Sequence, residues 1–215
     1  MARGSLITIE GVDGAGKSTL ARALVDALSG AGHEVELLRE PGGVDLSERL
    51  RGLVKDPGLR VSPRAEALLF AAARAQLVAE RVRPLLETGV TVLLDRYVDS
   101  SLAYQGAARE LGVGAVREIN DFATGGLSPD RTLLLKLDPA VGRARHAERL
   151  GRPPDRFERE DERFFGRIAA AYDELAASEP DRVRVLDASF TPATVLSDAL
   201  EALRDLPSLA ASGRG

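Results

Sequence analysis

One loop near the N-terminus combines glycines with a lysine and a serine at a spacing that handles phosphates. The pattern is Gly-x4-Gly-Lys-Ser, and the residues are Gly11, Val12, Asp13, Gly14, Ala15, Gly16, Lys17, Ser18 and Thr19. Glycines allow backbone conformations and close approaches that side chains would block, so the loop N–H groups can surround a polyphosphate. Lys17 can reach the β- and γ-phosphates, and the Ser18 hydroxyl can ligate Mg²⁺. The loop therefore predicts binding of ATP or GTP.

The sequence on either side of this loop supports the prediction. The apolar run 6–9 precedes the loop as an expected strand, and the helical pattern 17–29 follows it. A helix that begins at the loop directs its positive N-terminal dipole at the bound phosphates. A glycine-rich turn without a ligand is the alternative, and the complete motif in a strand–loop–helix context argues against it.

Composition limits the class of protein. The chain has 215 residues, enough for one domain with a substantial core, and no cysteine, which excludes a disulfide framework and a cysteine zinc site. The net charge of −4 gives no general basic field for nucleic acid. No apolar run approaches the ~18 residues that span a bilayer. We expect a cytoplasmic protein with neither a nucleic-acid nor a membrane partner.

Short apolar runs alternate with helical patterns along the chain. The expected strands are residues 6–9, 35–38, 90–94, 132–137 and 183–186, and the expected helices are 17–29, 46–54, 63–87, 98–108, 113–124, 140–149, 161–177 and 192–204. Runs that are apolar throughout suit strands buried on both faces of a parallel sheet. The order predicts an α/β protein, a three-layer α/β/α sandwich around a five-stranded parallel sheet.

Other signals refine this outline. Ser62-Pro63 and Thr191-Pro192 each place a capping hydroxyl before a proline at the first helical position. Pro84 is expected to kink or end the third helix. We expect a single domain over residues 1–206, a mobile arginine-rich lid over about 143–160, and a disordered tail over 207–215.

Charged residues follow the second and third expected strands. Ligands of such sheets lie outside the carboxyl ends of the strands, so these residues should meet at one edge. Asp95 suits Mg²⁺, directly or through water, and Arg96 beside it could hold a second anion. A helix cap with a surface arginine is the alternative. Arg39 and Glu40 precede a Pro-Gly-Gly turn, where a plain turn is the competing interpretation.

Phe70 and Arg74 stand four residues apart on an expected helix, so they share a face. An aromatic ring and a guanidinium group can stack on a flat base and hydrogen-bond its edge. This spacing alone more often means a core phenylalanine beside a surface arginine.

The region after the fourth strand is rich in arginine. Eight arginines occur there: Arg143, Arg145, Arg149, Arg152, Arg156, Arg159, Arg163 and Arg167. Interleaved acidic residues make a solvated, salt-bridged helix one interpretation. Phosphoryl transfer, however, requires cations around the transferred group, and a closing lid can supply them. At least one catalytic arginine is expected in this region, and the sequence does not identify which.

The same arginines bear on the acceptor. A phosphate monoester is mostly ionised at neutral pH, because its second pKa is about 6, so it needs cations more than a general base. The arginines at the strand ends and in the lid therefore favour a nucleoside monophosphate acceptor over an alcohol. Asp13 or Glu40 could nevertheless serve as a base for an alcohol.

Taken together, these motifs resemble those of the thymidylate kinase family over about residues 5–204. The matching segments are 11–19, 39–43 with Leu46 and Arg51, 68–70 with Ala73 and Arg74, 95–97 with 100–106, Pro129-Asp130 with Thr132, Leu137-Asp138, and 155–158 with Phe165, Arg167 and Tyr172. The block from Asp95-Arg96-Tyr97 to Tyr104-Gln105-Gly106 is the most specific. The phosphate-binding loop alone is shared by many activities.

The resemblance implies a P-loop fold and an activity, the phosphorylation of dTMP to dTDP with ATP and Mg²⁺ in dTTP synthesis. It also implies a homodimer. Residues 11–19 would hold the ATP phosphates, Asp13 would reach the sugar 3′-OH of dTMP, and Ser18 and Asp95 would support Mg²⁺.

The acceptor site follows from the same resemblance. Phe70 would stack on thymine and Arg74 would bond its exocyclic oxygen, while Ser101 and Gln105 face the pyrimidine edge. Tyr104 would pack against the deoxyribose and disfavour a 2′-OH. Arg96, with Arg39 or Arg51 and near Glu40, would grip the acceptor phosphate.

Two departures from the family pattern stand out. Val44 follows the Pro-Gly-Gly turn where threonine is usual, so a local hydrogen bond is expected to be lost. Gly14 stands where some members carry a loop arginine, which favours a catalytic arginine from the lid, namely Arg149, Arg152 or Arg156.

Two other functions compete with this one. A deoxynucleoside kinase would phosphorylate a 5′-OH with Glu40 as base, but that family is expected to carry Glu-Arg after the third strand and often tryptophan near the Glu-Pro turn. This chain has Asp95-Arg96 and no tryptophan. A nucleotide-dependent switch would need neither Phe70 nor Arg74.

Overall fold

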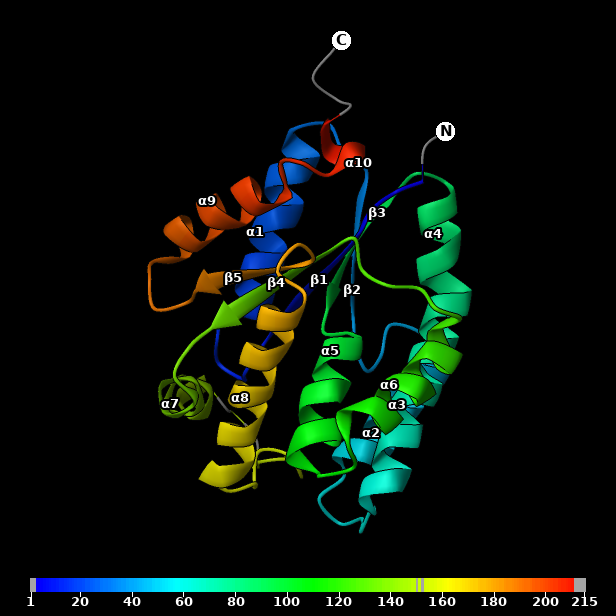
Figure 1. Ribbon diagram of the computed structural model, residues 1–215, viewed down its shortest axis with the longest axis vertical. Coiled ribbons are helices and arrows are strands. Elements are labelled where there is room, and N and C mark those ends of the chain that lie inside the picture. The colour runs from blue at the N-terminus through cyan, green and yellow to red at the C-terminus, as the bar shows by residue number, and fades with distance from the viewer. Residues whose placement is uncertain (1–2, 150, 152, 211–215) are drawn as a thin grey trace.

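A parallel five-stranded sheet lies at the centre of the structure, a computed structural model that describes residues 3–149, 151 and 153–210 (Figure 1). The strand order is β2-β3-β1-β4-β5, and every neighbouring pair is parallel. The strands are β1 (Leu6–Gly11), β2 (Val35–Arg39), β3 (Thr91–Asp95), β4 (Arg131–Lys136) and β5 (Val183–Asp187). The predicted fold and strand positions are confirmed, with small shifts at the ends.

Helices cover both faces of the sheet, which makes the three predicted layers. On one face lie α1 (Lys17–Gly30) and α9 (Pro192–Leu203), and on the other α4 (Arg83–Glu87), α5 (Val98–Ser101) and α8 (Glu162–Ser178). Side chains of β3 alternate between the layers. Leu93 packs in one buried cluster with Leu24 of α1, and Leu94 packs in another with Leu86 of α4.

The remaining helices lie around the carboxyl ends of the strands or in the C-terminal tail. They are α2 (Asp45–Lys55), α3 (Pro63–Leu77), η1 (Val78–Val82), η2 (Leu102–Ala108), α6 (Val113–Thr124), α7 (Pro139–Arg149) and α10 (Pro207–Ala210). In the described part of the chain, no helix combines the length and the apolar character needed to cross a membrane.

Both predicted capping pairs are confirmed. The hydroxyl of Ser62 accepts a hydrogen bond from the Ala65 N–H at 3.4 Å, and that of Thr191 accepts one from the Thr194 N–H at 3.3 Å. A proline occupies the first turn of each helix, where no N–H is required.

Two predicted helices contain a wider, π-helical turn. The helix expected over 63–87 consists of α3, η1 and α4, and Pro84 does not end it, because the chain stays helical to Glu87. The helix expected over 98–108 begins as α5 and continues as η2, whose last turn closes with a bond from the Arg109 N–H to the Tyr104 carbonyl at 2.9 Å. Such turns are rare and often occur at functional sites.

The predicted disordered tail is wrong for its first four residues. Residues 207–210 form α10, because Leu206 before them is buried in the main core and the Ser208 hydroxyl lies 2.5 Å from that of Ser5. Residues 211–215 lie outside the described part of the chain.

A buried ion pair joins α5 to the connection between α8 and β5. Arg182, in the connection before β5, donates to both oxygens of Asp99 at 2.7 and 3.0 Å. Asp99 is almost fully buried, so loss of its partner would leave a buried carboxylate with fewer donors.

We expect Arg182→Ala to lower the free energy of unfolding by about 3–5 kcal/mol, measured by urea denaturation. The matched control is Arg204→Ala, since Arg204 pairs with Glu201 at 3.1 Å with both side chains exposed, and a loss under about 1 kcal/mol is expected. Equal losses in the two variants would contradict the structural role of the Arg182–Asp99 pair.

Candidate functional site

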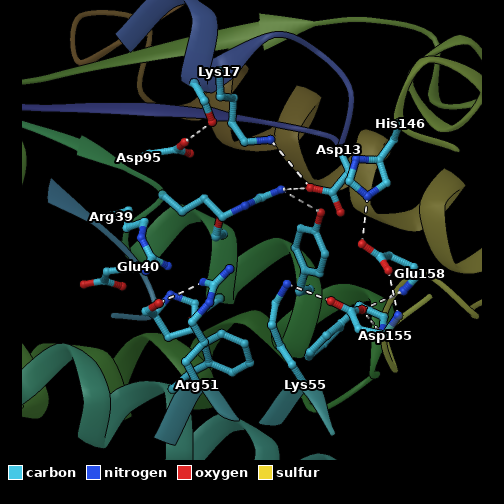
Figure 2. A pocket seen from close by; sticks show the side chains of 18 of the residues that line it. Asp13, Lys17, Arg39, Glu40, Arg51, Lys55, Asp95, His146, Asp155 and Glu158 are labelled. Atoms are coloured by element: carbon cyan, nitrogen blue, oxygen red, sulfur yellow. Dashed lines mark hydrogen bonds and ion pairs between the residues drawn. The ribbon is translucent and has the colours of Figure 1, made fainter. Parts of the chain in front are cut away.

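A cavity of about 380 Å³ opens at the carboxyl ends of β1, β2 and β3 (Figure 2). All the side chains predicted to bind the acceptor line it: Asp13, Arg39, Glu40, Arg51, Phe70, Arg74, Arg96, Ser101, Tyr104 and Gln105. The loop residues Gly14, Gly16, Lys17, Ser18 and Thr19 line the same cavity, as does Asp95. The donor and acceptor sites predicted from the sequence therefore share one space.

The phosphate-binding loop has the conformation that its glycines allow. Gly14 and Gly16 have φ of 78° and 98°, values that disfavour other residues. A Cβ on Gly14 would lie 1.9 Å from the Gly142 carbonyl oxygen, so this glycine also lets α7 pack directly on the loop. The side chains of Val12 and Ala15 are buried in the core.

Lys17 is held back against its own loop. Its ammonium group donates to the carbonyls of Gly11 at 3.0 Å and Val12 at 2.9 Å, and it lies 3.8 Å from an Asp13 carboxylate oxygen. Burial, with a further contribution from the nearby Arg96 charge, lowers the pKa of Lys17 to about 8. Bound phosphates would replace the carbonyls as partners and favour the charged amine.

The side chains of Ser18 and Asp95 meet beside the loop. The Ser18 hydroxyl donates to Asp95 at 2.9 Å, which joins the start of α1 to the end of β3. A hydroxyl and a carboxylate beside a polyphosphate site fit Mg²⁺, which is usually held by one or two protein groups plus phosphates and water. Within the described residues no cluster of three or more His, Cys, Asp or Glu could hold a metal alone.

Arg96 lies at the centre of the charged part of the cavity. Its φ of 71° is left-handed, an uncommon conformation for an arginine that other contacts must maintain. Its guanidinium group donates to Asp13 at 2.5 Å and to Ser100 at 3.0 Å, and it lies over the Tyr104 ring. Burial alone would raise the pKa of Asp13, but the charges of Arg96 and Lys17 hold it well below its usual range.

Glu10 supports Arg96 from beneath the cavity, a role that the sequence interpretation missed. Its carboxylate accepts from the Tyr97 N–H at 2.7 Å, from the Ser100 hydroxyl at 2.5 Å and from the Tyr172 hydroxyl at 2.8 Å. Burial and the nearby Asp99 carboxylate raise the pKa of Glu10. A single charged residue in a buried strand was the available signal.

Three aromatic rings form the apolar wall. Phe157, which the sequence interpretation did not assign, lies edge-on to Phe70 with centroids 5.8 Å apart and to Tyr104 at 6.4 Å. It belongs to the segment between α7 and α8, the expected lid. The lid therefore supplies part of the surface on which a flat base would lie.

Arg74 is more constrained than its predicted base-reading role suggests. Its side chain is buried, and its guanidinium group bonds Glu40 at 2.7 Å, Ser101 at 3.0 Å, the Tyr97 carbonyl at 2.9 Å and the Asn120 side chain. A bond to a base would have to share one of these donors. Burial, opposed by Arg74, raises the pKa of Glu40 to about 7.

Arg39 and Arg51 approach the cavity from β2 and α2. Arg39 donates to Glu48 at 2.9 Å, and Arg51 donates to the Pro41 carbonyl at 2.9 Å. Val44, at the start of α2, offers no side-chain cap and packs in a buried apolar cluster instead. Glu48 also accepts from the Gly43 N–H at 2.8 Å.

The expected lid contacts the body through side chains to which the sequence interpretation gave no role, although Asp155 and Glu158 belong to the matching segment 155–158. Lys55 of α2 donates to Asp155 at 2.7 Å, and His146 of α7 lies 2.7 Å from Glu158, all four lining the cavity (Figure 2). In the sequence alone, these polar side chains cannot be told apart from ordinary solvent-exposed residues.

The predicted catalytic arginines of the lid divide into two groups. Arg156 does not line the cavity, because its side chain donates to the Val54 carbonyl at 3.0 Å and to Glu66 at 2.5 Å. The Arg149 side chain and Arg152 lie outside the described residues.

The pKa of Lys17 gives a pH dependence with a definite sign. Polyphosphate binding favours the charged amine, so its contribution to ATP affinity should be full well below pH 8 and fall as the pH rises through the pKa of the free protein, about 8. A terminal phosphate, with a second pKa of about 6, is nearly fully ionised below that range, so the charge of ATP changes little across it. We expect ATP binding to be about 20-fold weaker at pH 9.5 than at pH 7.5 in calorimetric titrations, given the pKa of about 8 in the free protein. Lys17→Arg should remove the dependence, whereas equal affinities of the unaltered protein would contradict the assignment.

Comparisons with known proteins agree with the geometry. The family model of thymidylate kinase matches residues 9–199. The thymidylate kinase of Deinococcus radiodurans is 50% identical over 189 residues, which cover 88% of this chain and 91% of that protein. That of Leifsonia xyli is 52% identical over 186 residues, covering 86% and 88%. The crystal structure of thymidylate kinase from Ehrlichia chaffeensis superposes with a TM-score of 0.76 at 27% identity, over 94% of this chain and 99% of that one. The family model and curated relatives at about half identity each match most of the chain, so the chain belongs to the thymidylate kinase family.

Proposed function

We propose that this chain is a dTMP kinase that transfers the γ-phosphoryl group of ATP to dTMP, with Mg²⁺, and releases dTDP and ADP. One observation carries the proposal: Lys17 and an aromatic-walled pocket open into the same cavity, with Arg96 and Asp13 between them. Donor phosphates on the loop and a pyrimidine nucleotide in the pocket would present their phosphates to each other across that pair.

The cavity arginines would overcome repulsion between two anions. Arg96, with Arg39 and Arg51, grips the acceptor phosphate, which is already ionised and needs no base. Asp13 accepts from the sugar 3′-OH while its bond to Arg96 keeps that guanidinium in place. The Lys17 ammonium group stabilises the negative charge that develops on the β- and γ-phosphate oxygens during transfer.

The apolar part of the cavity would hold the nucleoside. Phe70 stacks on the base, Tyr104 packs on the deoxyribose, and Ser101 and Gln105 face the base edge. Arg74 holds Ser101 and Glu40 in position and reads the base only if it shares a donor.

Ser18 and Asp95 would hold Mg²⁺, which neutralises phosphate charge when bound. A lid arginine, Arg149, Arg152 or Arg156, would add charge at the transferring group. For Arg156 this requires exchange of its bonds to Glu66 and Val54 for phosphate oxygens. Rearrangement of this kind is typical of lids that close on substrate.

We also propose that the chain forms a homodimer through α2, α3 and α6, which lie together in Figure 1. Each presents exposed apolar side chains: Leu46, Leu53, Leu68 and Phe122. Phe122 is 92% exposed, which is unusual for an aromatic side chain and typical of an interaction surface.

The cytoplasmic location of the protein stays a prediction.

Light scattering coupled to gel filtration tests the dimer. We expect twice the chain mass for the unaltered protein and the monomer mass for Phe122→Glu. Phe190→Glu is the control, because Phe190 is also exposed, at 59%, but lies between β5 and α9. A monomeric unaltered protein, or dissociation by the control change as well, would reject the proposed face.

The function is tested by measuring ADP release from ATP and Mg²⁺ with each of six candidate acceptors: dTMP, dUMP, dCMP, dGMP, AMP and thymidine. We expect dTMP to give the highest kcat/KM, with dUMP lower by roughly 10–200-fold, since one methyl group in an apolar pocket contributes about 1–3 kcal/mol. Turnover of thymidine but not dTMP would instead make the chain a nucleoside kinase with Glu40 as base. No turnover of any acceptor would leave only a nucleotide-binding role.

A further inference from the structure

Glu66 lies behind the cavity wall, with no exposed side-chain area, on the buried side of α3. Oε1 of its carboxylate accepts from the Gln105 amide at 2.8 Å and from Arg109 at 3.2 Å, and Oε2 accepts from Arg156 at 2.5 Å. It does not line the cavity, so it can act on a bound nucleotide only through these neighbours.

The contact with Gln105 determines which end of the amide faces the cavity. A carboxylate that also pairs with two guanidinium groups acts as an acceptor, so the Gln105 atom that contacts it is the NH₂ group. The amide oxygen is then the free end of a side chain that is 1% exposed and lines the cavity. No donor within the described part of the chain bonds this oxygen.

An acceptor at this point distinguishes pyrimidines. Thymine and uracil present an N3–H donor at the base edge, whereas neutral cytosine presents a lone pair at N3. An amide oxygen bonds the first and repels the second, and the reverse holds for an amide NH₂. A buried polar group matched to a substrate group discriminates strongly, because a mismatch leaves both without a partner.

We propose that Glu66 is a positioning residue that sets selectivity for thymine over cytosine, by holding the Gln105 amide with its oxygen toward the acceptor base. The proposal rests on the proposed function in one respect, because it assumes that the base edge lies against Gln105. Arg74 would add a preference for an exocyclic oxygen by sharing one of its engaged donors, and in that case loss of Glu66 would weaken the discrimination without abolishing it.

Glu66→Gln tests the proposal, because a glutamine at this position can donate as well as accept and so permits either orientation of Gln105. The measurements are KM for dTMP and the competitive inhibition constants of dCMP and dUMP. We expect the ratio of the dCMP inhibition constant to the dTMP KM to fall about tenfold. The dUMP ratio should not change, since uracil has the same N3–H.

Arg156→Gln is the matched control, because it removes the lid contact of Glu66 and leaves the Gln105 contact in place. Its dCMP ratio should equal that of the unaltered protein, whatever happens to its rate. Should Glu66→Gln fail to fold, Glu66→Asp keeps the charge but withdraws the acceptor from Gln105, and the same fall is expected.

Two results separate the possible failures. If Gln105→Ala changes the dCMP ratio and neither Glu66 variant does, Glu66 is a structural ion-pair residue and the proposal is overturned. If Gln105→Ala also leaves the ratio unchanged, the placement of the base against Gln105 is wrong. An absence of dCMP inhibition in both the unaltered protein and the Glu66 variants counts as no change and overturns the proposal.

Discussion

Buried charges persist only when each has an opposite charge or a hydrogen-bonding partner beside it, and the carboxyl edge of this sheet brings several such charges together. Arg96 bonds Asp13 and Ser100, Ser100 bonds Glu10, and Glu10 bonds the backbone of the residue after Arg96. The left-handed backbone of Arg96 is one consequence of this closed set of contacts. These side chains hold one another in place around the cavity, so a change in one member alters the others.

The lid is tied to the acceptor side of the cavity. Phe157 completes the aromatic wall, Asp155 bonds Lys55 of α2, and Arg156 bonds Glu66 of α3. A base that enters the cavity must either displace the Phe157 ring or pack against it. If the acceptor binds as proposed, these direct contacts would couple its binding to the position of the segment between α7 and α8, as suits an enzyme that must exclude water from phosphoryl transfer.

The sequence was informative wherever the determinant was local. The loop glycines, the apolar strands and the residues at the strand ends follow from patterns within a few residues, and parallel topology then brings Asp95 beside Ser18. The partners of Glu10 and Glu66 were not predictable, because they come from segments distant along the chain. The π-helical turns depend on tertiary packing, which the intrinsic helix propensities of the residues do not predict. The resemblance correctly placed Arg74 at the cavity, but only the structure shows that its donors are already engaged.

The central claim is that the acceptor site is complete without the donor nucleotide. Calorimetric titration of dTMP into the ATP-free protein measures this directly. The account predicts saturable binding of one dTMP per chain, with affinity strongly reduced by Arg96→Met, which removes the charge that pairs with Asp13. Absence of dTMP binding until ATP is added would contradict it, because the site would then form only when the donor binds.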